Sequence, residues 1–116
     1  MHKNIYRKYS GIRLSVLPTP LQRLDNISSL FNANIFCKRD DMTGFAFGGN
    51  KTRKLEFLVA DALRKKADVL IGIGGIQSNF CRIASAAGAK YGFEVHLVLG
   101  GGKKPKKATG NLLLDE

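Results

Sequence analysis

The stretch that decides the fold is Val69-Leu70-Ile71-Gly72-Ile73-Gly74-Gly75-Ile76-Gln77-Ser78-Asn79. Its first five residues form a continuous apolar run, which is typical of a strand buried in a parallel sheet. A glycine-rich loop follows, and apolar residues then recur at helical spacing. These helical positions are Phe80, Ile83, Ala84, Ala87, Gly88 and Tyr91. The stretch therefore predicts a strand, a tight loop and a helix, which together are the basic unit of an α/β fold.

The same alternation continues on both sides of this unit. Downstream, residues 95–99 are a second strand candidate, and Thr109-Gly110-Asn111 is a candidate cap for a last helix. Upstream, a short strand is predicted over residues 35–38 and a helix over residues 51–66. The apolar stripe of that helix is Leu55, Leu58, Val59, Ala62 and Leu63. The order of the elements predicts an α/β fold, an open parallel sheet with right-handed helical crossovers.

Two further local patterns give structural predictions. Thr19-Pro20 has the signature of a helix start, and an apolar stripe follows it, so a helix is predicted over residues 21–31. His96 lies within the apolar strand candidate and is interpreted as a core histidine. Because the chain stops on an apolar run that has barely started, we expect the fold to be incomplete in this chain.

The formal net charge of +10 indicates an anionic partner, such as nucleic acid, a phosphate ligand or a membrane surface. However, the basic residues are dispersed from the amino terminus to the cluster at 103–107, which favours solvated helix faces and a basic loop. The aromatic residues that stack bases are not interleaved with them. We therefore expect no nucleic-acid partner.

Cysteine usage and hydropathy indicate a location. Cys37 and Cys81 stand far apart in apolar contexts, as free thiols do in a reducing compartment. No apolar run approaches the roughly 20 residues of a membrane helix. Residues 1–4 lead into no signal-peptide core. We expect a soluble, cytoplasmic protein without membrane association.

The first candidate site is Gly48-Gly49-Asn50-Lys51-Thr52-Arg53-Lys54. Lys51 precedes Leu55 by one helical turn on the same face, so its side chain is expected to point toward the interior. Burial lowers the pKa of a lysine and makes its amine a nucleophile that reacts with carbonyl groups. Alternatively, Lys51 is an ordinary lysine of a first helical turn that extends to solvent. A phosphate-binding Walker loop is disfavoured, because Asn50 separates Gly49 from Lys51.

The second candidate site is the loop Gly74-Gly75-Ile76-Gln77-Ser78-Asn79. It follows a strand and opens a helix, so free backbone N–H groups and the positive helix end are expected to bind an anion such as a carboxylate or phosphate. Ser78 is also a candidate N-cap of the helix. The two roles are compatible, and the sequence leaves both open.

These two sites carry a resemblance to a known family. The stretch 38–56, from Lys38-Arg39-Asp40-Asp41 through Gly48-Gly49-Asn50-Lys51, closely resembles the cofactor-lysine region of D-cysteine desulfhydrases and 1-aminocyclopropane-1-carboxylate deaminases. Residues 75–79 resemble their substrate and cofactor loop, and Pro18-Thr19-Pro20-Leu21 and Thr109-Gly110-Asn111 match further landmarks. The similarity covers nearly the whole chain in the right order.

The resemblance implies a pyridoxal-phosphate enzyme of fold type II, similar in architecture to the tryptophan synthase β subunit. It implies that Lys51 carries the cofactor, that Asn50 lies beside it and that Asn79 hydrogen-bonds its phenolic oxygen. Ser78 is implied to hold the substrate carboxylate and to assist proton transfer, with Gln77 and Asn79 also at the substrate. Residues 1–116 then span the start of the large domain and part of the small domain, with no complete second domain. The full-length form is expected to be a homodimer.

The implied activity is that of a lyase or deaminase acting on a small amino acid. Conversion of D-cysteine to pyruvate, hydrogen sulfide and ammonia is favoured by the Lys-Arg-Asp-Asp-x-Thr-Gly stretch at residues 38–44. The alternatives are a 1-aminocyclopropane-1-carboxylate deaminase and a non-catalytic fragment of such an enzyme. One departure from the family pattern is Phe80, where relatives often carry a polar residue.

Overall fold

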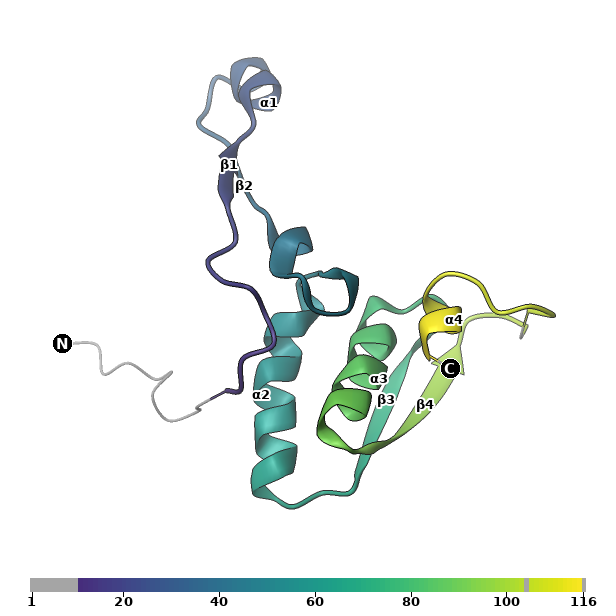
Figure 1. The fold of residues 1–116 in the computed structure, drawn as a ribbon. Coiled ribbons are helices and arrows are strands. Elements are labelled where there is room, and N and C mark those ends of the chain that lie inside the picture. Colours follow the sequence, from purple (N-terminus) through teal and green to yellow (C-terminus); the bar gives the residue numbers. More distant parts are fainter. Residues whose placement is uncertain (1–10, 104, 116) are drawn as a thin grey trace.

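The computed structural model describes residues 11–103 and 105–115. Residues 1–10, at whose start we expected no signal-peptide core, lie outside the described residues, as do Lys104 of the basic loop and Glu116. The described chain has two parts, an α/β body formed by residues 51–115 and a projecting arm formed by residues 21–38 (Figure 1).

The body is built on a parallel pair of strands, β3 (Val69–Gly75) and β4 (Glu94–Gly100). Helix α3 (Asn79–Tyr91) connects the two strands and packs on the sheet, while α2 (Lys51–Arg64) packs against α3. A short helix, α4 (Asn111–Asp115), lies beside α3. The predicted strand, loop and helix and the parallel α/β class are confirmed.

The core lies between α2, α3 and the start of the described chain. Seven buried residues form it: Leu14, Leu55, Val59, Ile83, Ala84, Ala87 and Phe93. Of the predicted stripe on α2, Leu55 and Val59 are buried, whereas Leu58 is 52% exposed and Leu63 is 39% exposed. The buried face of α2 is therefore shifted from the predicted stripe, because it also includes Thr52, Glu56 and Ala60.

Only one face of the β3–β4 sheet is covered within the described residues. Gly72 and Gly74 face α3, since a Cβ on either would contact its side chains or its N-cap. Ile71 and Ile73 alternate with them and are 72% and 74% exposed. His96 lies on this open side, and its Nε2 is 2.9 Å from an Oε1 of Glu94. The interpretation of His96 as a core histidine is wrong, because strand alternation turns it away from α3.

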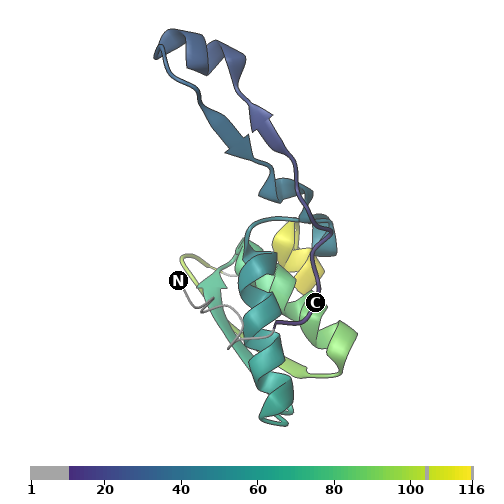
Figure 2. The same ribbon diagram turned by 90° about the vertical axis from the view of Figure 1, so that its left-hand side faces the viewer.

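The arm is an antiparallel hairpin of β1 (Leu21–Arg23) and β2 (Phe36–Lys38), with α1 (Asp25–Leu30) at its tip (Figures 1 and 2). The strand predicted at residues 35–38 is confirmed, but the helix predicted over residues 21–31 is wrong in its first part. Leu21 pairs with Lys38 instead, and the buried Thr19 hydroxyl donates to Asp40 at 3.1 Å, so it does not cap a helix. Pairing across the hairpin overrides the local helical pattern.

Two short 3-10 helices, η2 (Asp40–Thr43) and η3 (Phe45–Phe47), connect the arm to α2. No helix between residues 11 and 115, in the part that the structure describes, has the length and apolar character that a membrane span requires.

Candidate active site

The loop before Lys51 is held in one conformation by a fully buried threonine. The Thr43 hydroxyl oxygen accepts a hydrogen bond from the Gly49 N–H at 2.9 Å, and it lies 3.0 Å from the Gly49 carbonyl, to which the hydroxyl can donate. The Gly49 N–H also donates to the Asp40 carbonyl at 3.1 Å. Helix α2 begins directly after this loop, with Lys51 as its first residue.

Lys51 is half-buried, which lies between the two alternatives that the sequence left open, a buried amine and an amine extended to solvent. Asn50 stands at the N-cap position, is exposed and makes no side-chain capping bond, which leaves its amide available to a ligand. The placement of both side chains is compatible with the roles that the resemblance implies for them.

The loop before Lys51 packs against the first turns of α3. The Arg82 guanidinium donates to the Gly48 carbonyl at 2.9 Å, and a Cβ on Gly49 would lie 4.0 Å from Ile83 Cδ1. The Lys54 ammonium lies 6.0 Å from the centre of the Phe80 ring. Figure 1 shows that the amino ends of α2 and α3 lie at the same edge of the body, the edge where β3 and β4 end. The fold therefore brings together the two sites found separately in the sequence.

Ser78 caps α3. Its Oγ accepts from the Cys81 N–H at 3.3 Å, and its backbone is extended, as at an N-cap. The hydroxyl hydrogen is not used by this bond, so Ser78 can cap the helix and still donate to an anion. The first N–H groups of α3 lie at this helix end as well. They are available to an anion, because a helix leaves them without intrahelical partners.

Gln77 and Asn79 join this end of α3 to the loop before α4. The Gln77 amide donates to the Thr109 carbonyl at 3.0 Å and accepts from the Asn111 N–H at 2.9 Å. The Asn111 amide donates to the Gln77 carbonyl at 2.9 Å and to Asn79 Oδ1 at 2.8 Å. Gln77 therefore has a scaffold role, and its place at the substrate stays a prediction.

The charges around the site are partly neutralised by internal pairing. The Arg53 guanidinium, in the first turn of α2, makes two 2.7 Å bonds to the Asp40 carboxylate. These hydrogen bonds from Arg53 hold the pKa of Asp40 below its usual range. Since its guanidinium is engaged by Asp40, Arg53 is not a free cation for a ligand, whereas the Lys51 amine is not held by any described ion pair.

The side chains at this edge fit pyridoxal phosphate. The group needs a primary amine for its aldehyde, which Lys51 would supply, and a donor for its phenolic oxygen, which Asn79 would supply. Gly74 lets the loop turn tightly under Ser78, since a Cβ there would lie only 2.5 Å from Ser78 Oγ. Phe80, where relatives often carry a polar residue, packs against the core. The difference from the family pattern therefore lies at a residue with a structural role.

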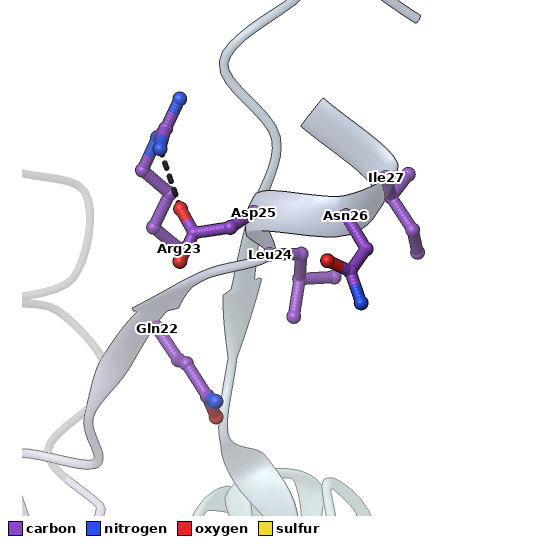
Figure 3. Close-up of a pocket in the computed structure, with 6 residues that line it drawn as sticks. All are labelled: Gln22, Arg23, Leu24, Asp25, Asn26 and Ile27. Atoms are coloured by element: carbon purple, nitrogen blue, oxygen red, sulfur yellow. Dashed lines mark hydrogen bonds and ion pairs between the residues drawn. The ribbon is translucent and has the colours of Figure 1, made fainter. Parts of the chain in front are cut away.

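A separate hollow in the structure does not coincide with this site. It lies on the arm and is lined by six consecutive residues, Gln22 to Ile27 (Figure 3). Its ionic groups, Arg23 and Asp25, pair with each other and are largely exposed. None of the residues predicted for catalysis or binding contributes to it.

The fold is that of the fold type II pyridoxal-phosphate enzymes. Residues 12–114 match the family model described as "Pyridoxal-phosphate dependent enzyme", so the chain belongs to that family. It is 45% identical over 114 residues to a Pyrococcus furiosus protein named "Putative 1-aminocyclopropane-1-carboxylate deaminase", covering 98% of this chain and 34% of that protein. It is 46% identical over 111 residues to the D-cysteine desulfhydrase of Klebsiella pneumoniae, covering 92% of this chain and 34% of that protein.

A solved structure agrees with these relatives. A chain from a "Crystal Structure Analysis of the ACC deaminase homologue" superimposes with a TM-score of 0.85 at 43% sequence identity, covering 99% of this chain and 35% of that chain. The chain thus spans about a third of the length of the relatives that it matches. The assignment to the family and its fold is confirmed, and so is pyridoxal phosphate as the family's cofactor.

Sequence reasoning missed three residues that shape the site. Thr43 fixes the loop before Lys51, Arg82 fastens that loop to α3, and Asn111 contacts Asn79. In the sequence, Asn111 stands out only as part of a helix-capping triplet and family landmark. Arg82 and Asn111 contact partners that are distant in the sequence, and Thr43 contacts Gly49 within an irregular loop. No periodic pattern in the sequence therefore indicated their roles.

Proposed function

We propose that this chain carries the cofactor lysine and the substrate loop of a pyridoxal-phosphate lyase that acts on a small amino acid. The observation that carries the proposal is the arrangement of Lys51 and the Ser78–Asn79 loop at one edge of the body. Arg82 holds the two segments together through its 2.9 Å bond to the Gly48 carbonyl. The assignment of Lys51, Asn50, Gln77, Ser78 and Asn79 to the site is part of the proposal.

Each residue has a distinct task. Pyridoxal phosphate, when bound, supplies an electron sink that makes the α-proton of an amino acid acidic. Lys51 would hold the cofactor through its amine, and the same amine would act as the base that takes up that proton. Asn79 and Asn50 would help to hold the cofactor. The Ser78 hydroxyl, the Gln77 segment and the first N–H groups of α3 hold the substrate carboxylate.

We infer D-cysteine as the substrate, with pyruvate, hydrogen sulfide and ammonia as products after the uptake of water. Support comes from the resemblance of residues 38–44 and from relatives named D-cysteine desulfhydrase, one of which, from Salmonella paratyphi B, is 52% identical over 85 residues. In the structure, Asp40 of this stretch binds Arg53, and Thr43 binds the Gly49 N–H. Both residues therefore support the loop that precedes Lys51.

The second candidate substrate is 1-aminocyclopropane-1-carboxylate. It is supported by the name of the Pyrococcus furiosus relative and by the matching solved structure, which is that of an "ACC deaminase homologue". Both substrates present a carboxylate and an amine on one carbon, which the same loop can hold. The two candidates differ in the bond that breaks, a carbon–sulfur bond or a ring bond.

The setting of the enzyme is also a proposal. We infer a cytoplasmic protein, supported by the free thiols of Cys37 and the buried Cys81. We infer that the residues span the start of the large domain and part of the small domain of a homodimeric enzyme. Small amino acids, and neither nucleic acid nor membranes, are its proposed partners.

Covalent attachment of the cofactor tests the proposal directly. The purified chain is incubated with pyridoxal phosphate, reduced with borohydride and mapped by mass spectrometry. We expect one modified lysine, Lys51, and a visible absorbance band that borohydride removes. In Lys51→Ala both signals are expected to be lost, because the proposal places the cofactor on the Lys51 amine.

Lys54→Ala is the matched control, since it removes an exposed amine one turn further along the same helix. It is expected to keep the modification on Lys51. Equal labelling of many lysines in the unaltered chain, or labelling that survives Lys51→Ala, contradicts the proposal. D-Cysteine and 1-aminocyclopropane-1-carboxylate are then compared by the change that each causes in the visible band and by release of hydrogen sulfide.

A further inference from the structure

The orientations of two side-chain amides at the site, those of Gln77 and Asn111, are fixed by backbone groups. The Thr109 carbonyl can only accept, so the Gln77 atom 3.0 Å from it is the nitrogen, and Gln77 Oε1 faces the Asn111 N–H at 2.9 Å. The Gln77 carbonyl can likewise only accept, so the Asn111 atom 2.9 Å away is Nδ2. No rotation of either amide by half a turn preserves these bonds.

These orientations determine the orientation of Asn79. Because Asn111 Nδ2 is a donor, the Asn79 atom 2.8 Å from it must be the acceptor, Oδ1. The Asn79 amide therefore turns its NH2 group away from Asn111. Neither hydrogen of that group is used by the contact with Asn111, so both can donate to a ligand.

The loop before α4 is shaped for this contact. Gly110 has a left-handed backbone with φ of 59°, and a Cβ on it would lie 2.6 Å from Gln77 Oε1. A side chain at this position would push the Gln77 amide away from the Asn111 N–H. The glycine thus lets the two segments, more than 30 residues apart in the sequence, approach closely enough to share four hydrogen bonds.

We propose that Asn111 is a positioning residue that acts through Asn79. It holds the Asn79 Oδ1 and so presents the Asn79 NH2 group as a donor to the phenolic oxygen of pyridoxal phosphate. The inference rests on the proposed function, because it needs Asn79 to face the cofactor. Without Asn111, the exposed Asn79 amide is free to rotate, and half of its orientations offer an acceptor to an oxygen that needs a donor.

The cofactor band provides the test. The chain is loaded with pyridoxal phosphate, and the pH midpoint of its visible band is measured in the unaltered chain, Asn79→Ala, Asn111→Ala and the double variant. We expect both single variants to shift the midpoint in the same direction and to weaken cofactor binding about fivefold, the effect of one lost hydrogen bond. The double variant is expected to match Asn79→Ala alone.

Controls separate positioning from folding. Thr109→Ala keeps the backbone carbonyl that Gln77 uses, so its band is expected to remain unshifted. Asn111→Asp keeps the shape of the side chain and removes its N–H donors, and it replaces Asn111→Ala if that variant does not fold. In the cofactor-free chain, nuclear magnetic resonance is expected to show the Asn79 side-chain amide signals moving in either Asn111 variant and staying in place in Thr109→Ala.

The outcomes distinguish two failures. If the unaltered chain shows no borohydride-reduced adduct on Lys51, the proposed function fails and this inference fails with it. If the adduct forms but the shifts of the two single variants add in the double variant, Asn111 is only structural and the inference alone is overturned. A shift caused by Asn111→Ala that disappears in the Asn79→Ala background supports it.

Discussion

At the scale of single residues, the site depends on positions where a side chain would be too large. Gly74 lies at the end of β3 beneath the cap of α3, and a Cβ there would lie 2.5 Å from Ser78 Oγ and 2.8 Å from Cys81 Sγ. Neither atom has room to retreat, since Cys81 is fully buried and Ser78 holds the helix end. Glycine at this position allows the loop to turn directly from strand to helix.

Gly74→Ala is therefore expected to lower the free energy of unfolding by about 1–3 kcal/mol through overpacking. It is also expected to weaken cofactor and substrate binding, because Ser78 must move. Gly75→Ala is the control, since the nearest atom to its Cβ, the Gly100 carbonyl oxygen, would be 3.8 Å away. Urea unfolding of both variants measures the difference, and equal loss in the two would contradict the packing explanation.

At the scale of elements, α3 combines structural and chemical functions at its amino end. The Ser78 hydroxyl oxygen accepts a bond from the helix, while in the proposed function its hydrogen and the first N–H groups of the helix hold the substrate carboxylate. Serine and aspartate are comparable as N-caps, but they differ in charge. This difference allows the two functions to be separated.

Ser78→Asp is expected to keep the stability of the chain, because the carboxylate still accepts from the Cys81 N–H. It is expected to abolish the response of the visible band to D-cysteine, because it repels the substrate carboxylate. Ser78→Ala, by contrast, should lose about 1 kcal/mol of stability along with the cap. A Ser78→Asp variant that binds substrate normally would show that Ser78 is a cap only.

At the scale of the whole molecule, the arm and the body are joined by a cluster of polar residues. The Arg53 guanidinium of α2 binds the Asp40 carboxylate and also donates to the Thr19 hydroxyl at 3.1 Å, at the base of the arm. The Glu56 carboxylate accepts from the N–H groups of Leu14 and Ser15 at 2.9 and 2.8 Å. Two turns of α2 thereby hold the chain segment that precedes the arm.

Because Arg53 lowers the pKa of Asp40, the stability from this pair is present above the ordinary aspartate pKa of about 3.9 and is lost as the pH falls through the lower folded value. Asp40→Asn is expected to cost roughly 1–2 kcal/mol at pH 7. The cost should shrink at about pH 3, below the ordinary aspartate pKa of about 3.9, because the unfolded chain then binds a proton that the folded, Arg53-paired carboxylate resists. Urea unfolding at the two pH values measures this, and a difference independent of pH would exclude the pair as its source.

The sequence by itself determined the class of fold and the identity of the candidate site residues. Periodicity predicted α2, α3, β3 and β4, and the glycine loops drew attention to Lys51 and Ser78, because these signals are encoded within one or two turns of chain. Family resemblance, carried by residues 38–56 and 75–79, then predicted the cofactor, and the family match confirms it.

Only the tertiary structure decided what depends on contacts between distant segments. The start of the arm became a strand because Leu21 meets Lys38 across the hairpin, and His96 is exposed because α3 covers only the other face of its strand. The contacts of Asn111 with Gln77 and Asn79, and of Arg82 with Gly48, join residues 32 to 34 positions apart. Such pairs leave no periodic trace in a single sequence, because their geometry is set by how the elements pack.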